Sequence, residues 1–342
     1  MRTASRIVSP TGAEIFKGLG MHFVILGGGA LGSILAAHLL QAQHSVTLVA
    51  RGARAQALAA QGLRLDGLCQ LAVPCAPQTN PSLVTACDVF INTVKTYDTA
   101  AALAPFAQLA PKVAFSVQNG VMKEAALAQV FGAACVVGAM ADFSGELGAE
   151  GTVTFTRNVC LHLGAMTPAQ APRVAALVSA VDAAGIVCQV APAITEVVWS
   201  KYVGWVALML MAVLTRQRTV VFLSDPDSAR VVARITREMG ALAAAQGIGL
   251  RDQSPVPALQ LMAGSEDAAV AVVQQLGASF AASAPAHRMS TLQDVERGRP
   301  LEVEETAGYA LALARSCQLE LPTLALCYQL AAAVHRAHLA MA

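Results

Sequence analysis

The feature of this sequence that most constrains its fold is a glycine-rich turn near the N-terminus, between an apolar stretch and an alanine-rich one. Residues 22–32 read His-Phe-Val-Ile-Leu-Gly-Gly-Gly-Ala-Leu-Gly, so a short apolar strand leads directly into Gly27, Gly29 and Gly32. A helix pattern follows the glycines, and a second strand pattern occupies residues 45–49. A strand, a helix and a parallel strand in this order form a βαβ unit, the local structure in which such a turn binds a dinucleotide.

Each residue of the turn has a physical role in that kind of site. Gly27 permits the tight turn from strand to helix, Gly29 has no side chain to block a pyrophosphate, and Gly32 lets the helix pack close to the strand. The free N–H groups at the start of the helix, at Ala30 and Leu31, point at the phosphates together with the positive end of the helix dipole. We therefore predict a cofactor site at these five residues. The alternative is a glycine-rich turn that has no ligand.

The end of the second strand pattern indicates which dinucleotide binds. NAD sites usually have Asp or Glu there, as a partner for the ribose 2′-hydroxyl. This chain has Val-Ala-Arg-Gly-Ala-Arg at residues 49–54, with no carboxylate to repel a 2′-phosphate. The guanidinium of Arg51 can pair with that phosphate through two hydrogen bonds. We therefore predict NADP(H) as the cofactor and Arg51 as the residue that selects it; the alternative is a solvated loop arginine.

Length and composition favour two domains and give no reason to expect affinity for nucleic acid or membranes. The chain has 342 residues, of which 55% are hydrophobic and 13% are charged, so large cores are easy to build. Its net charge is +1 and its Lys and Arg residues form no cluster, so no nucleic-acid or anionic-membrane partner is predicted. The longest apolar run, residues 203–214, is shorter than the ~20 residues that span a bilayer, and we interpret it as a buried core helix.

The cysteines and the N-terminus give two further expectations. The eight cysteines show neither a C-x-x-C spacing nor a pairing with His at metal-ligand spacing, so no metal site is predicted. Such scattered cysteines are typical of small buried residues in the reducing cytoplasm. Residues 1–20 have no core pattern and lack the apolar segment of a secretory signal. We expect them to be either a disordered extension or residues upstream of a functional start at Met21.

The alternation of short apolar strands with alanine-rich helices predicts an α/β domain with a parallel sheet, followed by an all-α domain. The predicted domains are a Rossmann-type dinucleotide-binding domain at 21–192 and a helical substrate-binding domain at 193–342, with the ligand in the crevice between them. Strand patterns lie at 22–27, 45–49, 88–93, 112–117, 134–140 and 186–190, with a hairpin pattern at 152–163. Helix patterns lie at 30–42, 53–61, 97–109, 168–183, 194–215, 225–246, 266–283, 301–318 and 323–340.

Lys201 is a candidate catalytic residue because it directly precedes the long apolar run. Its turn of the helix is therefore expected inside the protein or along a cleft. Burial lowers the pKa of a lysine, and a lysine with a lowered pKa can act as a general acid near neutral pH. The alternative is a lysine at the edge of a core helix whose ammonium group extends to water.

Five short motifs occur in an order and spacing that are more specific than the glycine turn alone. They are Gly-Gly-Gly-Ala-Leu-Gly at 27–32, Thr-Val-Lys at 93–95, Gln-Asn-Gly-Val at 118–121, Trp-Ser-Lys at 199–201, and Ser-Thr-Leu-Gln-Asp at 290–294 followed by Arg-Pro-Leu-Glu-Val-Glu at 299–304. In these motifs the chain resembles the ketopantoate reductase (2-dehydropantoate 2-reductase) family, and the likeness covers nearly all of residues 21–342. The resemblance implies an NADPH-dependent oxidoreductase that reduces a 2-oxo acid, converting ketopantoate to pantoate in pantothenate biosynthesis.

The resemblance also implies roles for individual residues. Lys201 matches the family's catalytic lysine, which protonates the substrate carbonyl as hydride arrives, and Asn119 matches an asparagine near the nicotinamide and that lysine. Lys95 matches a lysine at the mouth of the cofactor and substrate site. Ser290 matches a serine that contacts the substrate carboxylate, and Glu302 matches a glutamate that orients the substrate. Each also has an ordinary structural explanation; Ser290, for example, could cap a helix in a Ser-x-x-Gln box.

The chain departs from the family pattern on one side of the implied substrate pocket. The family typically has asparagines four and eight residues after the catalytic lysine, where this chain has Trp205 and Met209, and Ala307 replaces a further asparagine. Residues at these spacings share one helix face with Lys201. The departures leave a second substrate class open, a branched or aromatic 2-oxo acid outside pantothenate synthesis. Alternatively, Trp205 packs in the core and the asparagines' role is filled elsewhere.

A function of a different class is also open at this point. A protein that keeps the dinucleotide site without catalysis would be an NADP-binding sensor, although the presence of Lys201 and Glu302 argues against it. A panel of 2-oxo acids tested with NADPH discriminates between these hypotheses. The alanine-rich second domain could also bury one face against a second copy, so a homodimer is among the assemblies that the sequence allows.

Overall fold

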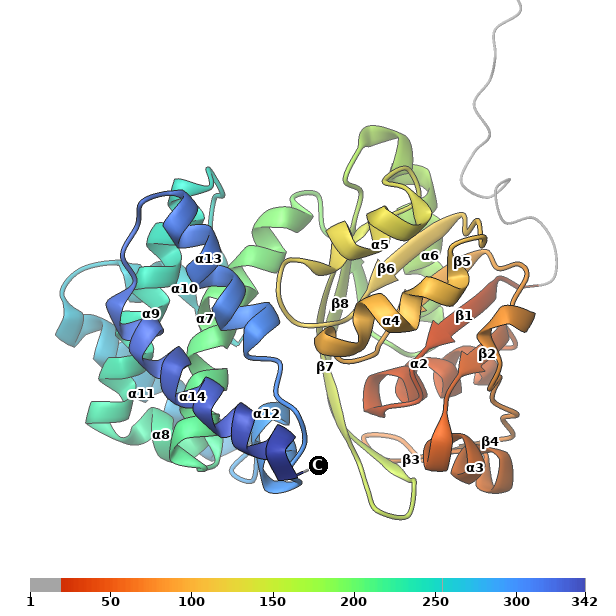
Figure 1. Ribbon diagram of the computed structural model, residues 1–342, viewed down its shortest axis with the longest axis horizontal. Coiled ribbons are helices and arrows are strands. Elements are labelled where there is room, and N and C mark those ends of the chain that lie inside the picture. Colours follow the sequence, from red (N-terminus) through yellow and green to blue (C-terminus); the bar gives the residue numbers. More distant parts are fainter. Residues whose placement is uncertain (1–19, 254, 342) are drawn as a thin grey trace, which may run out of the picture. The chain divides into compact units, whose positions relative to one another are not determined.

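Strands and helices alternate through the first half of the chain in the computed structural model, which describes residues 20–253 and 255–341 (Figure 1). The expected extension at 1–20 lies, apart from Gly20, outside the described residues. The strands are β1 (His22–Leu26), β2 (Ser45–Val49), β3 (Leu63–Gly67), β4 (Leu71–Val73), β5 (Val89–Asn92), β6 (Val113–Ser116), β7 (Gly138–Leu147), β8 (Val153–Gly164) and β9 (Cys188–Val190). The helices of this half are α2 (Ala30–Gln41), α3 (Gly52–Gln61), α4 (Thr99–Leu103), α5 (Lys123–Phe131) and α6 (Ala171–Ala183).

The first sheet is parallel, as predicted, with the strand order β2-β1-β5-β6. Successive side chains of a strand point to opposite faces. In β1, Phe23 and Ile25 therefore join a core that includes residues of α2, whereas Val24 and Leu26 join a second core that contains Leu103 of α4. Burial on both faces explains why these strands are apolar without alternation.

A second, mixed sheet adds a layer that the sequence pattern did not separate from the first. Its strand order is β4-β3-β8-β7, and β9 pairs with β8. Helix α2 contacts β2 of the parallel sheet and also β3, β7 and β8 of the mixed sheet, so it lies between the two sheets. The long strands β7 and β8 form an antiparallel pair that extends from this layer (Figure 1).

Three sequence-based assignments differ from the structure in this half. The strand predicted at 134–140 begins only at Gly138 and runs to Leu147 as β7. Residues 152–163 do not form a hairpin but most of the single strand β8, because the polar Arg157 in its middle pairs with Asp142 of β7 at 2.7 and 3.0 Å instead of making a turn. The predicted helix 97–109 is reduced to the five residues of α4 with a 3₁₀ turn on either side. Pro105 explains the break, since proline has no backbone N–H to continue the hydrogen bonds of the helix.

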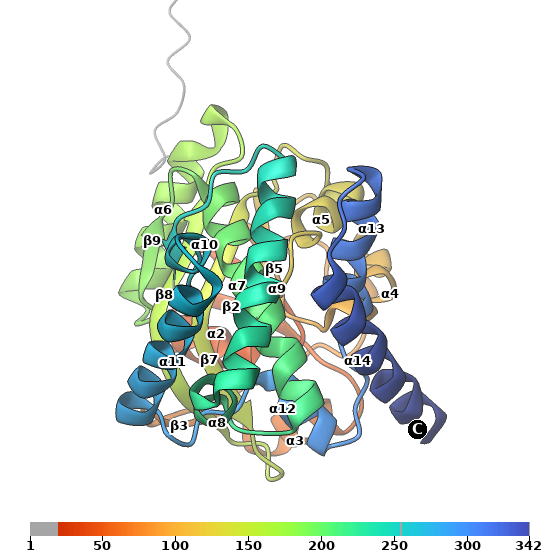
Figure 2. The same cartoon turned by 90° about the vertical axis from the view of Figure 1, so that its left-hand side faces the viewer.

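The second half is almost entirely helical, as predicted, with only the two-residue strands β10 (Asp252–Gln253) and β11 (Val256–Pro257) among its described residues. Helix α9 (Pro226–Ala245) contacts five other helices of this half, namely α8, α10, α11, α13 and α14 (Figure 2). These and the remaining helices are α7 (Ile194–Thr215), α8 (Thr219–Ser224), α10 (Ala258–Met262), α11 (Glu266–Ser283), α12 (Ser290–Glu296), α13 (Tyr309–Ser316) and α14 (Pro322–Met341). The predicted helix at 301–318 begins as a π-helical turn, Glu304–Gly308.

Among the described residues, α7 is the one helix whose length and composition would allow it to cross a membrane. In the structure, 89% of its most apolar window is buried inside the protein. Its side chains form much of the core of the helical half, from Val203 to Val213. It therefore has the burial of a core helix, in agreement with the interpretation of the apolar run.

The chain divides into two compact units whose border does not follow a single point in the sequence. The first unit comprises residues up to Val94, Asp98–Gln118 and Glu124–Ile194. The second contains everything from Thr195 onward together with two short segments of the first half, Lys95–Tyr97 and Asn119–Lys123. These segments follow β5 and β6, so two loops of the parallel sheet contribute residues to the helical unit.

Candidate active site

The glycine turn of the first unit has the close packing that a βαβ nucleotide site requires. Gly27 has a φ of +113°, a conformation that residues with a Cβ rarely adopt. A Cβ on Gly32 would lie 2.0 Å from the carbonyl oxygen of Gly27, so α2 approaches the turn as closely as the backbone permits. Thr93, just after β5, fixes the turn by donating its hydroxyl to the carbonyl oxygens of Leu26 and Gly27 at 3.0 and 2.9 Å.

The middle of the turn leaves room for a phosphate. Gly29 is exposed, and a Cβ built there meets no atom within 4 Å. The first hydrogen bond of α2 runs from the N–H of Ser33 to the oxygen of Gly29, so the N–H groups of Ala30 and Leu31 have no partner within the helix. Open space beside free N–H groups at a helix N-terminus is the arrangement that binds anions. These residues therefore fit the pyrophosphate of a dinucleotide.

Two arginines near the end of β2 have different roles. Arg51 lies just before α3 with 83% of its side chain exposed, and its guanidinium donates to the Asp98 carboxylate at 2.8 Å. Arg54 is instead committed to the fold, because its guanidinium donates to the oxygens of Gly28 and Gly151 and to Ser33. Of the two, only Arg51 can reorient toward a ligand without breaking contacts of the interior.

Sequence reasoning overlooked Arg54, which anchors the glycine turn from the first turn of α3. Its Nε atom donates to the Gly28 oxygen at 2.7 Å, and burial lowers the pKa of its guanidinium from the ordinary value. A half-buried arginine with three acceptors is a structural residue rather than a selector. In the sequence, Arg54 is one of two arginines after the second strand. That pattern does not distinguish an arginine that anchors the turn from one that selects the cofactor.

In the second unit, Lys201 and Asn119 lie together although they are far apart in the sequence. Lys201 stands on the second turn of α7 and is half-buried. Its ammonium group donates to the Asn119 side-chain oxygen at 3.1 Å. Asn119 is held in a tight loop by Gly120, whose φ of +86° suits glycine. An ammonium carries three protons, so the hydrogen bond to Asn119 uses one of the three donors of Lys201.

A cluster of three charged side chains forms a second polar centre in the same unit. The ammonium group of Lys95 lies 2.6 Å from Asp294 and 3.2 Å from Glu302. The other carboxylate oxygen of Glu302 accepts the backbone N–H of Thr96 at 2.9 Å. Both carboxylates are almost fully buried, with side chains 5% exposed, whereas 35% of the Lys95 side chain is exposed. Glu302 therefore holds the loop that follows β5 as well as the lysine.

The charge balance of this cluster shifts the pKa values of its members. Burial alone would lower the pKa of Lys95, but Glu302 and Asp294 together outweigh burial and raise it. Burial raises the pKa of the Asp294 carboxyl, and the Lys95 ammonium offsets only part of that effect. The two carboxylates thus favour the charged form of the lysine, whereas burial, with a smaller contribution from the charge of Glu302, disfavours the ionised form of Asp294.

Ser290 does not occupy the N-cap position that the Ser-x-x-Gln pattern suggests. It is the first residue of α12, and the cap position belongs to Met289, which makes no side-chain capping bond. The helix-cap explanation for this serine is therefore wrong, and Ser290 is exposed. Asp294 lies one turn further along α12, and the motif alone assigns it no role. Its buried ion pair with Lys95 could not be predicted, because neither residue's sequence neighbours identify the partner.

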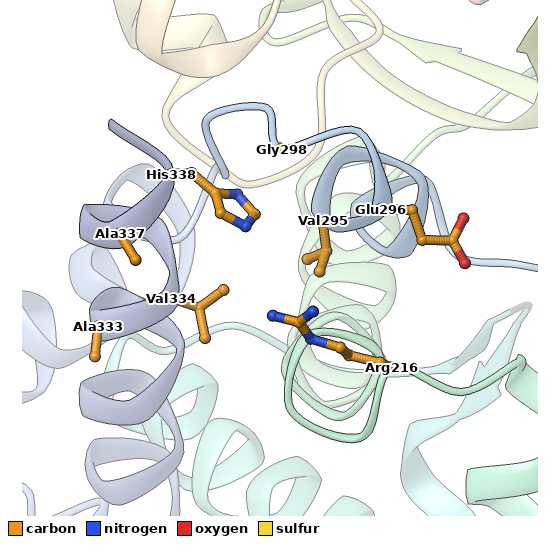
Figure 3. A pocket seen from close by; sticks show the side chains of 8 residues that line it. All are labelled: Arg216, Val295, Glu296, Gly298, Ala333, Val334, Ala337 and His338. Atoms are coloured by element: carbon orange, nitrogen blue, oxygen red, sulfur yellow. The ribbon is translucent and has the colours of Figure 1, made fainter. Parts of the chain in front are cut away.

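A separate pocket of about 520 Å³ lies in the helical unit beside α12 and α14 (Figure 3). The guanidinium of Arg216 and the ring of His338 point into it, whereas the carboxylate of Glu296 points away (Figure 3). Its other lining residues are small or apolar: Val295, Gly298, Ala333, Val334 and Ala337. None of the predicted site residues lines it.

Family models match both halves of the chain. The model described as "Ketopantoate reductase PanE/ApbA" matches residues 23–168, and the one described as "Ketopantoate reductase PanE/ApbA C terminal" matches residues 193–335. Among curated relatives, the 2-dehydropantoate 2-reductase of Archaeoglobus fulgidus is 28% identical over 82% of this chain and 86% of its own length. That of Mesorhizobium japonicum is 26% identical over 89% of this chain and 94% of its own.

Solved structures show the same fold. A ketopantoate reductase from Ralstonia eutropha JMP134 has a TM-score of 0.78 at 23% identity, covering 93% of this chain and 99% of its own. A D-mandelate dehydrogenase bound to NADH and anilino(oxo)acetate has a TM-score of 0.80 at 17% identity, with the same coverage. The combination of a parallel-sheet α/β half and a helical half, predicted from the sequence, is therefore confirmed.

Proposed function

Because the chain belongs to the ketopantoate reductase family, we propose that it reduces a 2-oxo acid to a 2-hydroxy acid with NADPH, ketopantoate being the substrate and pantoate the product. The observation that carries the proposal is the hydrogen bond from Lys201 to Asn119 at 3.1 Å. It holds an ammonium group in place next to a loop that follows the parallel sheet. Such a group is what a carbonyl oxygen needs as it gains negative charge.

Lys201 acts as the general acid in this proposal. The bound NADPH supplies hydride to the carbonyl carbon of the substrate. As the carbonyl π bond breaks, its electron pair becomes a negative charge on oxygen, and Lys201 donates a proton to that oxygen and becomes neutral. The lysine then regains a proton from water. Since the charge exists only as hydride arrives, the ammonium stabilises the transition state more than the bound ketone.

The other residues bind and orient. Asn119 fixes the direction of the Lys201 ammonium, and the family resemblance implies that it acts near the nicotinamide. Ser290, exposed at the start of α12, donates its hydroxyl to the substrate carboxylate. Glu302 orients the substrate while it also holds Lys95, which we place at the mouth of the cofactor and substrate site.

The cofactor binds on the first unit. Gly27, Gly29 and Gly32 and the N–H groups of Ala30 and Leu31 would hold its pyrophosphate. Arg51 leaves Asp98 to pair with the 2′-phosphate, an exchange of one exposed carboxylate for a phosphate that costs little in water. The relatives named above are 2-dehydropantoate 2-reductases, and on that basis we propose a cytoplasmic enzyme that acts on a small molecule.

A homodimer is the assembly that we propose. One neighbour with a TM-score of 0.69, a ketopantoate reductase from Staphylococcus aureus, is described as dimeric. In this chain Leu326 and Leu330 are 60% and 52% exposed and lie four residues apart on α14, so they form an apolar strip on one helix face. Light scattering of the purified protein at two concentrations measures the mass directly.

Steady-state kinetics of Lys201→Ala with ketopantoate and NADPH test the proposed function. We expect kcat to fall by about 10²–10⁴, the range for a positioned general acid. NADPH affinity, measured by fluorescence titration, should stay within a few-fold of the wild type because Lys201 belongs to the other unit. Turnover close to that of the wild type in this variant removes Lys201 from the mechanism, and binding of NADPH without oxidation by any 2-oxo acid favours the sensor hypothesis.

A further inference from the structure

The pocket in the helical unit lies at the end of α7 that is remote from Lys201. Trp205 and Met209, which follow the lysine, are 5% and 0% exposed and pack in the core of this unit. Arg216 directly follows the last residue of α7, roughly 20 Å along the helix from the lysine, and lines the pocket. A volume of about 520 Å³ is in the range of small-molecule sites. The pocket is therefore large enough for a ligand of its own.

The guanidinium of Arg216 is available to such a ligand. Arg216 has a φ of +53° at a position after a helix where glycine or asparagine is usual, so the backbone does not require an arginine there. Its side chain points into the pocket (Figure 3) and makes no hydrogen bond or ion pair with any of the described residues. A guanidinium in this situation can bind a carboxylate through two parallel hydrogen bonds.

His338 supplies the second polar group of the pocket. It lies in the last turn of α14, is 5% exposed, and its ring points into the pocket (Figure 3). Its Nδ1 atom lies 2.9 Å from the carbonyl oxygen of Arg299. Because a carbonyl oxygen can only accept, Nδ1 carries the proton, and Nε2 of the neutral ring is an acceptor. No described residue donates to Nε2, so this atom can accept a hydrogen bond from the hydroxyl group of a ligand.

The rest of the pocket is apolar, and its one carboxylate faces elsewhere. Val295 of α12 and Val334 of α14 line it together with two alanines and a glycine. The carboxylate of Glu296 points away from the pocket (Figure 3) and accepts a hydrogen bond from Arg288 at 2.6 Å. An anion on Arg216 would therefore have a hydrocarbon surface beside it and no carboxylate of the lining aimed at it.

The ends of α7 and α12 oppose an anion here only weakly. Both helices end beside the pocket, and the C-terminal end of a helix carries partial negative charge. That effect is screened by water at an exposed position such as Arg216. A two-bond contact between a guanidinium and a carboxylate is among the strongest polar contacts in proteins, so it outweighs the helix ends.

We propose that this pocket is a second ligand site, which binds a small hydroxy acid with a branched carbon chain. The carboxylate pairs with Arg216, a hydroxyl group donates to Nε2 of His338, and the carbon chain packs against Val295 and Val334. The site does not involve Lys201 or the other residues of the proposed reaction. Pantoate is 2,4-dihydroxy-3,3-dimethylbutanoate and combines these three groups, so it is the probe; only this choice of probe rests on the proposed function.

Isothermal titration calorimetry of the full chain with pantoate, in the absence of NADPH, tests the carboxylate contact. We expect Arg216→Met to weaken binding at this site about ten- to a hundredfold, the effect of losing a charged hydrogen-bonded contact. Arg218→Met removes the same charge from an exposed arginine outside the pocket that makes no side-chain capping bond, and it should bind as the wild type does. Binding that is unchanged in Arg216→Met, or an equal loss in Arg218→Met, overturns the proposal.

The same titrations in Lys201→Ala separate the two sites. Binding at the pocket should persist in Lys201→Ala and be lost in the double variant with Arg216→Met. Binding that depends on Lys201 alone belongs to the proposed active site and overturns the second site. Oxidation of NADPH by ketopantoate should remain close to wild type in Arg216→Met. Its absence in the wild type contradicts the proposed function and leaves the titration results valid.

A probe without hydroxyl groups tests the role of His338. The acid 3,3-dimethylbutanoate keeps the carboxylate and the branched chain of pantoate. We expect the Lys201→Ala protein to bind pantoate about tenfold more tightly than this acid, the effect of one hydrogen bond to Nε2. His338→Phe in the same background should bind both acids alike. Equal binding of the two acids before that substitution overturns the assignment of His338, and this comparison does not depend on the folding of His338→Phe.

Discussion

Replacing two glycines of the turn, one at a time, tests the cofactor site because the structure assigns them different consequences. In Gly32→Ala the added carbon would lie 2.0 Å from the Gly27 oxygen and 2.6 Å from the Thr93 hydroxyl. Favourable non-bonded separations are roughly 3.5–4 Å, so the turn or α2 must move by more than about 1 Å. In Gly29→Ala the added carbon meets no atom within 4 Å, and the φ of −71° is available to alanine.

The expected magnitudes follow from these distances. The clash in Gly32→Ala involves a backbone atom that cannot rotate away, so we expect the upper part of the overpacking range, about 3 kcal/mol. For a unit of this size that lowers the Tm by roughly 6–12 °C. Gly29→Ala changes only the helix cap and costs less than about 1 kcal/mol. Its methyl group would instead occupy the space of the pyrophosphate, so NADPH affinity falls at least about tenfold, or 1.4 kcal/mol.

Differential scanning calorimetry and fluorescence titration with NADPH measure the two effects on the same samples. The expected pattern is a large loss of stability in Gly32→Ala and a loss of affinity at nearly native stability in Gly29→Ala. Native affinity in Gly29→Ala would refute the placement of the pyrophosphate on this turn. Native stability in Gly32→Ala would refute the close approach of α2 to Gly27.

The remaining predictions concern charged groups. Arg51→Ala should weaken NADPH binding about ten- to a hundredfold and leave NADH binding nearly unchanged, as measured by paired titrations; equal losses would remove Arg51 as the selector. Lys95→Met leaves Asp294 and Glu302 facing each other, and because a third of the lysine side chain is exposed we expect a loss of about 1–3 kcal/mol in urea unfolding, below the range for a fully buried pair. The raised pKa of Asp294 means that its stabilising contribution is present below the ordinary value of 3.8 and is lost as pH rises through the folded-state pKa. Asp294→Asn has no such dependence, so its Tm relative to the wild type should increase from pH 4 toward pH 7, and a difference that stays flat or falls would contradict the raised pKa.

Local patterns predicted the elements that are stabilised locally. The helices at Ala30–Gln41, Ile194–Thr215 and Glu266–Ser283 were predicted to within a residue, because long apolar or alanine-rich runs bounded by turn residues specify their own ends. The strand Ser45–Val49 was predicted for the same reason. Where the chain depends on distant partners, the prediction failed: β3 and β4 were not recognised, since β3 is completed by pairing with β8 from far along the chain.

The residues of the candidate site also differ in how far they could be predicted from their sequence neighbours. The glycine turn could be predicted because its chemistry lies in consecutive residues. The pairs Lys201–Asn119 and Lys95–Glu302 join residues that are 82 and 207 positions apart, and only the resemblance to a family predicted a shared site for these residues. Asp294 and Arg54 had no assigned role, because neither the acidic residue nor the arginine shows from its neighbours in sequence which partner it meets in the fold.

The membership of two loops in the helical unit has a consequence for how this protein can be recombined. A chimera joined at residue 193, with the helical half taken from a relative, would inherit its Lys201 and Glu302 equivalents from one parent and Lys95 and Asn119 from the other. Contacts that were selected together would then be mismatched, even though the junction itself lies between well-formed elements. Exchanging 95–97 and 119–123 along with the helical half keeps both hydrogen-bonded pairs within one parent, so the functional module of this chain is discontinuous in the gene.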